Sequence, residues 1–193
     1  MARWFLVLLF SAGAGVSVAQ SAAPDADIVV AVRKDKETIF VDVDCPVRAP
    51  LPVIWEVLTD YDHMSGFISS LEYSGIEGRR DNILMVRQKG KAALGLFRFA
   101  FDNVREVEIV PLVEIRSHHV SGDLESSTFT TRVIEVDGTP HIINIGRYIP
   151  KAWVPPLVGP ALIGGETRKQ FADIRTEILR RSARPAANLT SRQ

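Results

Sequence analysis

The residues best suited to metal or acid–base chemistry are the four histidines, and their spacing argues against a metal site. His118 and His119 are neighbours in a strand-like stretch, so their side chains should point to opposite faces of a sheet. His63 lies in a turn and His141 at the start of another strand-like stretch, with no His-x-His or His-x-x-x-His pair. Zinc and iron sites need several converging ligands. We therefore predict that the chain holds no metal ion.

Asp60 and Asp62 could form a pair of carboxylates for general acid–base work. They stand in a turn that follows a helical stretch, however, and aspartates in such turns commonly accept hydrogen bonds from backbone N–H groups. We therefore favour a capping role for both. The chain has no Gly-x-Ser-x-Gly elbow, phosphate loop or dinucleotide fingerprint, so no cofactor is predicted.

Composition favours an exported protein without a nucleic-acid partner. Residues 4–18 are apolar, follow a basic residue and end at a small-x-small cleavage site, which is typical of a signal peptide. This run is shorter than the roughly 20 apolar residues that span a bilayer, so stable membrane insertion after cleavage is not expected. The 193 residues carry 23 basic and 23 acidic side chains, which leaves no basic footprint for nucleic acid.

The expected organisation follows from these features. We predict a signal peptide over residues 1–19, a linker over 20–27, one ligand-binding domain over 28–182 and a flexible tail over 183–193. The mature chain should start near Gln20 in the periplasm, after export across the inner membrane. The single cysteine, Cys45, can form no internal disulfide, and its apolar strand predicts a buried structural thiol. The sequence does not indicate an oligomeric state.

Stretches rich in β-branched and aromatic residues predict a mainly antiparallel sheet. They span residues 28–32, 39–43, 71–77, 83–89, 94–106, 112–121, 126–136 and 141–149, separated by turn signals. Two short helices are expected near residues 50–68, where Pro50 and Pro52 mark a helix start. In the fifth stretch, alternation puts Phe97, Phe99 and Phe101 on one apolar face and Arg98 on the other.

The sheet is expected to surround one long helix over residues 154–182. Thr167, Phe171, Ile174 and Ile178 recur at helical spacing, whereas charged residues lie opposite, at 168, 169, 173, 175, 177, 180 and 181. Extended backwards, the same stripe reaches Gly164, Ala161 and Leu157, so large side chains disappear from it. This loss of volume predicts a hydrophobic cavity between helix and sheet. The alternative is a tightly packed pair of helices joined at Gly164-Gly165.

Several segments together resemble the START-like polyketide cyclase/dehydrase and coenzyme Q-binding family. Residues 47–71 contain Val-Ile-Trp-Glu-Val-Leu-Thr-Asp-Tyr, residues 106–124 give a strand, a Pro turn, a strand and a Gly-Asp turn, and residues 148–156 resemble the loop into the last helix. The likeness covers most of residues 40–182. One departure is that residues 126–131 are rich in hydroxyl groups, where such domains often carry a Gly and a Trp.

The resemblance implies an α+β helix-grip fold, in which a curved antiparallel sheet and a long C-terminal helix enclose a pocket for an apolar molecule. It would also turn Ile142, Asn144 and Tyr148 inward, which makes Asn144 and Tyr148 candidates for orienting a ligand. Together with the cavity hypothesis, this gives a set of candidate ligand-binding residues: Trp55, Phe97, Phe99, Phe101, Asn144, Tyr148, Trp153, Leu157, Ala161 and Gly164.

Two classes of function remain open. The first is a non-catalytic carrier or binding protein for a hydrophobic small molecule, such as a lipid, a quinone or a polyketide-like compound. The second is a cyclase or dehydratase that uses Tyr148, Asn144 and His119 as acid–base groups. We favour binding because no convergent catalytic set is visible. A third hypothesis, an interaction-only protein, would have its cavity filled by aromatic side chains, including Trp55 and Phe171.

Overall fold

The computed structural model describes residues 27–94, 97–152, 154 and 159–184, with backbone only at 92–94 and 97–98. The elements follow the order β1 (Val29–Asp35), β2 (Thr38–Pro46), α1 (Leu51–Thr59), η1 (Tyr61–Gly66), β3 (Leu71–Arg80), β4 (Ile83–Leu94), β5 (Phe97–Val110), β6 (Glu114–Gly122), β7 (Leu124–Val136), β8 (Thr139–Pro150) and α2 (Gly159–Ser182). The predicted α+β class, the strand meander and the two short early helices are confirmed.

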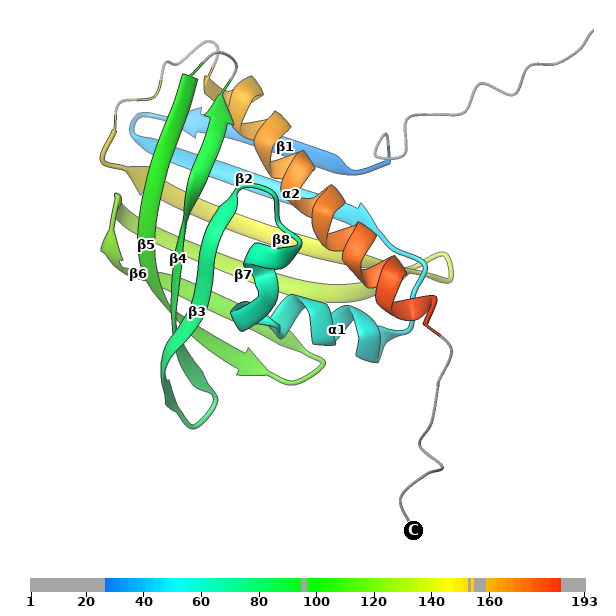
Figure 1. Ribbon diagram of the computed structural model, residues 1–193. Coiled ribbons are helices and arrows are strands. Elements are labelled where there is room, and N and C mark those ends of the chain that lie inside the picture. Colours follow the sequence, from blue (N-terminus) through cyan, green and yellow to red (C-terminus); the bar gives the residue numbers. More distant parts are fainter. Residues whose placement is uncertain (1–26, 95–96, 153, 155–158, 185–193) are drawn as a thin grey trace, which may run out of the picture.

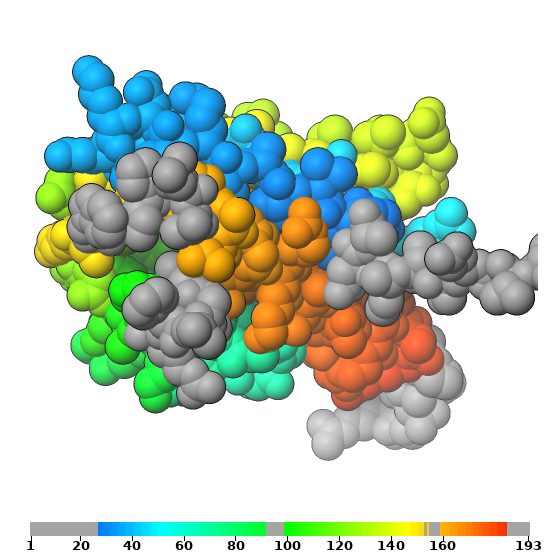
Figure 2. Space-filling view, turned by 90° about the horizontal axis from the view of Figure 1, so that it is seen from above, coloured from blue at the N-terminus to red at the C-terminus, as the bar shows by residue number. Residues whose placement is uncertain are grey.

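All strands belong to one antiparallel sheet of eight strands, in the order β1-β2-β8-β7-β6-β5-β4-β3. The meander from β3 to β8 closes onto the β1–β2 hairpin because β8 pairs with β2. The sheet curves around α2, which crosses its concave side diagonally (Figure 1). Seen from above, the start of α2 lies between the β1–β2 hairpin and the green strands β4 and β5 (Figure 2).

The hydrophobic core fills one half of the space between α2 and the sheet. Strand β2 alternates strictly, with Ile39, Val41, Val43 and Cys45 buried on its inner face. The second half of α2 adds Ile178, which is fully buried, and α1 contributes Ile54, Trp55, Val57 and Leu58. These apolar side chains leave water together, which is the main stabilising contribution to such a domain.

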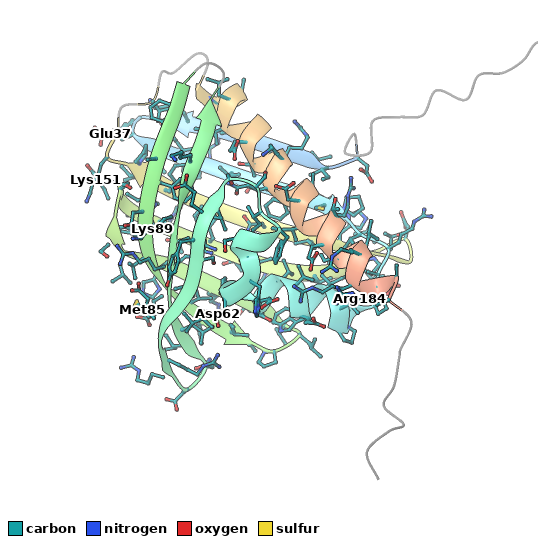
Figure 3. The ribbon with its side chains drawn as sticks, viewed as in Figure 1. Glu37, Asp62, Met85, Lys89, Lys151 and Arg184 are labelled. Atoms are coloured by element: carbon teal, nitrogen blue, oxygen red, sulfur yellow. The ribbon has the colours of Figure 1, made fainter. Side chains whose placement is uncertain are left out.

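Two aspartates next to α1 do not cap it as predicted. Asp60 accepts hydrogen bonds from His63 and from Arg181 of α2, each at 2.6–2.7 Å. Asp62, labelled in Figure 3, accepts the backbone N–H of Ile76 at 2.8 Å. The carboxylates therefore join this turn to α2 and to β3.

The charged side of α2 is also more buried than its helical periodicity predicted. Arg175 is 7% exposed and donates to Asp27 at 2.7 Å, and Glu177 is 6% exposed between Arg180 and Arg181. The hydrogen bonds from Arg180 and then Arg181 lower the pKa of Glu177 to about 2. Arg181 also reaches Glu56 of α1 at 2.7 Å. This ion-pair cluster fastens the second half of α2 to α1.

Helix α2 is continuous through Gly164 and Gly165, so the alternative of two joined helices is wrong. Its start differs from the prediction, because Val154 is not helical and the helix begins at Gly159. Pro160 stands in the first turn, where a backbone N–H has no acceptor within the helix. Proline, which lacks this N–H, therefore costs no hydrogen bond there. The predicted candidates Trp153 and Leu157 lie outside the described residues.

Cys45 should resist modification while the protein is folded. Its side chain is fully buried on the inner face of β2, and its partner across the ladder is Ile142, which is also fully buried. A bulky thiol reagent should therefore label the native protein slowly and the urea-unfolded protein at once. The check is mass-spectrometric labelling with and without urea. Rapid labelling under native conditions would contradict the burial of this residue.

Candidate functional site

A cavity of about 440 Å³ lies between the concave face of the sheet and the first half of α2. This volume falls within the roughly 300–1,000 Å³ of small-molecule pockets. Figure 3 draws the described side chains on the ribbon, including those of the sheet and of α2. The apolar part of the lining comes from Val41, Leu58, Tyr61, Met64, Ile68, Leu71, Phe101, Ile115, Leu124, Phe129, Ile163, Phe171 and Ile174.

Alternation along the strands sets which side chains enter the cavity. On β5, Phe101, Asn103 and Arg105 share one phase and all three line it. Arg105 is paired directly with His119 of β6. The next pair is Val104 with Ser121, so Val120 is an extra residue in a β-bulge. The bulge shifts the register only beyond this pair, so Arg105 and His119 belong to the regular part of the ladder.

The prediction that the two adjacent histidines point apart is confirmed. His119 lines the cavity, whereas the side chain of His118 is 59% exposed on the outer face, 3.7 Å from Glu106. The outer face of the same sheet also carries Arg116 and Arg132, which both pair with Glu114. Their outward placement agrees with the alternation of β6 and β7. Within the described part of the chain, no three potential metal-ligating side chains gather.

The cavity has a substantial polar lining. It consists of Gln88, Asn103, Arg105, Ser117, His119, Ser127, Thr131, Asn144, Tyr148, Glu166, Thr167 and Gln170. Some of these groups satisfy one another. The Asn144 amide donates to Thr131 at 2.7 Å, and the Gln170 amide donates to Ser70 at 3.1 Å. A polar lining of this extent suits a molecule that is apolar but carries polar groups.

Gln88 joins several polar groups on the sheet side of the cavity. Its amide nitrogen donates to Ser74 at 3.0 Å and lies 3.4 Å from the sulfur of Met64. Its amide oxygen accepts a hydrogen bond from Arg105 at 2.8 Å. The guanidinium of Arg105 also lies over the ring of Tyr61, 5.7 Å from the ring centroid. Arg105 is therefore held in place from two sides.

Tyr148 presents a protonated phenol to the cavity. Burial raises its pKa to about 12, because the phenolate would lose its hydration. Its ring stacks on Phe129 of the neighbouring strand, with 6.2 Å between the ring centroids. Phe129 in turn covers Gly146, where any Cβ would collide with the phenylalanine ring. At neutral pH Tyr148 can therefore donate a hydrogen bond, and it is a poor general base.

The structure brings three of the predicted candidates to the cavity: Phe101, Asn144 and Tyr148. It places the others elsewhere or does not describe their side chains. Trp55 belongs to α1 and is 8% exposed in the core, and Phe99 is 43% exposed at the end of the sheet. The side chains of Phe97, Trp153 and Leu157 are outside the described set. Whether any of these residues contacts a ligand stays a prediction.

The inner stripe of α2 differs from the one extrapolated from the sequence. Ala161 is exposed and Gly164 is buried against β1, whereas Ile163, Glu166 and Thr167 line the cavity. The extrapolation ran backwards from Thr167 to Gly164 and Ala161 in two steps of three residues. Each such step falls about 60° short of a full helical turn, so the predicted stripe rotated away from the cavity. The cavity therefore exists beside this half of α2, but Gly164 does not create it.

Gly164 should accept a small side chain and reject a large one. A Cβ there would lie 3.5 Å from Val32 Cγ2 of β1, which is ordinary van der Waals contact. Gly164→Ala is thus expected to stabilise the fold by up to about 1 kcal/mol through helix propensity. Gly164→Leu should destabilise it by about 1–3 kcal/mol, because the side chain must push against β1. Urea unfolding of both variants checks this, and a Leu variant as stable as the wild type would contradict it.

Several residues that line the cavity were not among the candidates predicted from the sequence. Arg105 and Asn103 continue the phase of Phe101, so the alternation already marked them as inward-facing. The hydroxyl-rich stretch on β7 was recognised as unusual, and Ser127 and Thr131 do line the cavity. No sequence pattern indicated Glu166 and Gln170, because they lie beside the apolar stripe of the helix and not on it.

No family model matches the sequence, and no curated protein matches it. Solved structures do match the fold. An aromatase/cyclase from a Streptomyces species superposes with a TM-score of 0.64 at 15% identity, over 79% of this chain and 99% of that one. A STAR-related lipid transfer protein from Xanthomonas axonopodis gives 0.60 at 9% identity, over 78% and 98%.

A START superfamily protein from Mycobacterium smegmatis likewise gives a TM-score of 0.60 at 12% identity, over 73% of this chain and 97% of that one. Likeness at such identities concerns the fold alone. The chain therefore has the START-like, helix-grip fold that its sequence motifs suggested. No helix among the described residues has both the length and the apolar character required to cross a membrane.

Proposed function

Because a START-like fold here encloses an amphiphilic cavity, we propose that this protein is an exported, non-catalytic carrier for an apolar small molecule. The ligand would be a lipid, a quinone or a polyketide-like compound held between the sheet and α2. The observation that carries the proposal is the cavity itself, about 440 Å³ in volume and lined by both apolar and polar side chains. Pockets of this composition hold small molecules in many folds.

A cyclase or dehydratase that uses the same cavity is the alternative. Among the solved structures with this fold is an aromatase/cyclase, and His119 lines the cavity as such a mechanism would need. Against it, Tyr148 keeps its proton and Asn144 is bonded to Thr131, so neither is poised as a base. A bound small molecule that is recovered chemically unchanged would support the carrier function. Time-dependent conversion of an added poly-β-keto substrate, lost on His119→Leu, would establish the enzyme instead.

The decisive experiment identifies what the protein carries. Native mass spectrometry of protein purified from its own compartment, followed by lipid extraction, should reveal a bound small molecule. A neutral environment-sensitive probe such as N-phenylnaphthylamine should then bind the extracted protein and be displaced by the recovered compound. A protein that carries no small molecule and takes up no probe would contradict the carrier function.

Export is part of the proposal and has its own check. The apolar run over residues 4–18 and its cleavage site support removal of residues 1–19. The mature protein should start near Gln20 and occur in the periplasmic fraction. N-terminal sequencing of the protein from that fraction tests this. Detection of Trp4 in the exported protein would contradict the cleavage.

A further inference from the structure

Three buried polar atoms, each on a residue that lines the cavity, lack hydrogen-bond partners. They are the Nε of Arg105, the Nδ1 of His119 and the Oε1 of Glu166. Each buried polar atom left without a partner costs about 1–3 kcal/mol, so folded proteins contain few of them. In the described part of this chain, all the buried side-chain nitrogen and oxygen atoms without partners belong to residues that line the cavity. This concentration indicates that a ligand completes their bonding.

Arg105 and His119 form one polar locus on the sheet. They are directly paired across β5 and β6, and both lie on the inner face. The printed contacts of Arg105 are with the amide of Gln88 and the ring of Tyr61, and among the described residues no carboxylate forms a salt bridge with it. A buried guanidinium gains most from an anionic oxygen acceptor. The Nε–H of Arg105 has no acceptor among the described residues.

Glu166 forms the complementary locus on α2. Its carboxylate lines the same cavity, and Oε1 is buried without a donor. An ionised carboxylate only accepts hydrogen bonds, so the group that completes it must be a donor such as a hydroxyl. The sheet side of the cavity therefore lacks an acceptor, and the helix side lacks a donor.

We propose that the ligand is an amphiphile whose polar end carries both an acidic oxygen, bound by Arg105 and His119, and a hydroxyl, bound by Glu166. This inference rests on the proposed carrier function and narrows its ligand to hydroxylated acids. A plain ester or hydrocarbon leaves all three buried groups unsatisfied. Sites built to hydrogen-bond a polar group discriminate strongly against analogues that lack it.

Displacement of N-phenylnaphthylamine by four compounds of equal chain length tests the inference. Methyl palmitate offers neither group, hexadecanol only a hydroxyl, palmitate only a carboxylate, and hydroxypalmitate both. One hydrogen bond to a charged group contributes about 1.5–3 kcal/mol, so each added group should tighten binding by roughly tenfold or more. Hydroxypalmitate should therefore bind most tightly and methyl palmitate most weakly.

Variants of Arg105 and Glu166 test which polar group of the ligand each locus binds. Arg105→Met should remove the preference for palmitate over methyl palmitate, and Glu166→Met should remove the preference for hydroxypalmitate over palmitate. Arg147→Met, on the exposed side of β8, and His118→Leu, beside His119 on the outer face, are matched controls that should change neither. If Arg105→Met does not fold, Arg105→Lys keeps the charge without the Nε donor and should weaken the preference.

The outcomes separate this inference from the carrier function. Equal displacement by all four compounds, or selectivity that survives in both variants, would mean that water completes these groups, and the inference would fail while the carrier function stands. A protein that binds neither probe nor any competitor would overturn both. Selectivity that is lost in the Arg105 and Glu166 variants and retained in the control variants would establish that these residues bind the polar end of the ligand.

Discussion

Thr167→Trp is expected to abolish probe uptake without unfolding the protein. Thr167 lines the cavity from α2, and the open space in front of it can accept an indole ring. The added ring would occupy the volume that a ligand needs, so the affinity for N-phenylnaphthylamine should fall at least about tenfold, or roughly 1.4 kcal/mol. Since a cavity is filled rather than a packed core strained, the free energy of unfolding should stay equal or rise. Fluorescence titration and urea unfolding measure the two quantities.

The control for this variant lies on the same helix. Thr176 is exposed, so Thr176→Trp adds the same ring to α2 and should leave probe binding unchanged. A Thr167 variant that binds the probe normally would show that the probe sits elsewhere. A severe loss of stability in Thr167→Trp, but not in Thr176→Trp, would show that α2 packs directly against the sheet in solution and leaves no cavity.

Gly90→Ala is expected to cost about 3 kcal/mol or more in the free energy of unfolding, the upper end for overpacking. A Cβ at this position of β4 would lie 2.0 Å from the backbone oxygen of Ser70. That oxygen already accepts the N–H of Lys91 at 2.9 Å, so the backbone cannot move aside without breaking a ladder contact. The new methyl would also press on the ring of Phe101, 2.8 Å away.

Thermal unfolding should show this cost as a fall in Tm of roughly 10 °C, on the scale of about 2–4 °C per kcal/mol for domains of this size. Gly78→Ala is the matched control in the adjacent strand β3. Its Cβ would meet only Met85 Cβ at 3.5 Å, an ordinary contact. A Gly90 variant as stable as the Gly78 variant would contradict the close approach of Ser70.

The fold was predictable from the sequence because local patterns carry most of it. Alternation in β2 and the turn signals between strands located the elements, and the motif around Trp55 indicated the START-like fold. Alternation also separated His118 from His119, which the structure confirms. These are short-range properties, since the period of a strand or helix acts on neighbouring residues.

The site was less predictable because it depends on long-range geometry. Phe99 and Phe101 share a phase on β5, yet only Phe101 lines the cavity. Phe99 lies near the start of β5, outside the part of the strand that borders the cavity, and no local pattern encodes where that part begins. The bulge at Val120 and the rotation of the α2 stripe toward Ile163 are likewise set by packing between distant segments. Arg105 is the exception, because its phase was visible in the sequence.

The two halves of α2 are anchored unequally. The second half is held by the core around Ile178 and by the ion pairs of Glu177 and Arg181, which do not involve the cavity. The first half borders the cavity, so part of its surface lacks protein contacts. Local opening is easiest where buried contacts are fewest, and a ligand that binds only the closed form suppresses it. For the proposed carrier, occupancy of the cavity would therefore be coupled to the local stability of the first half of α2, while the second half would hold the helix in place in both the empty and the loaded protein.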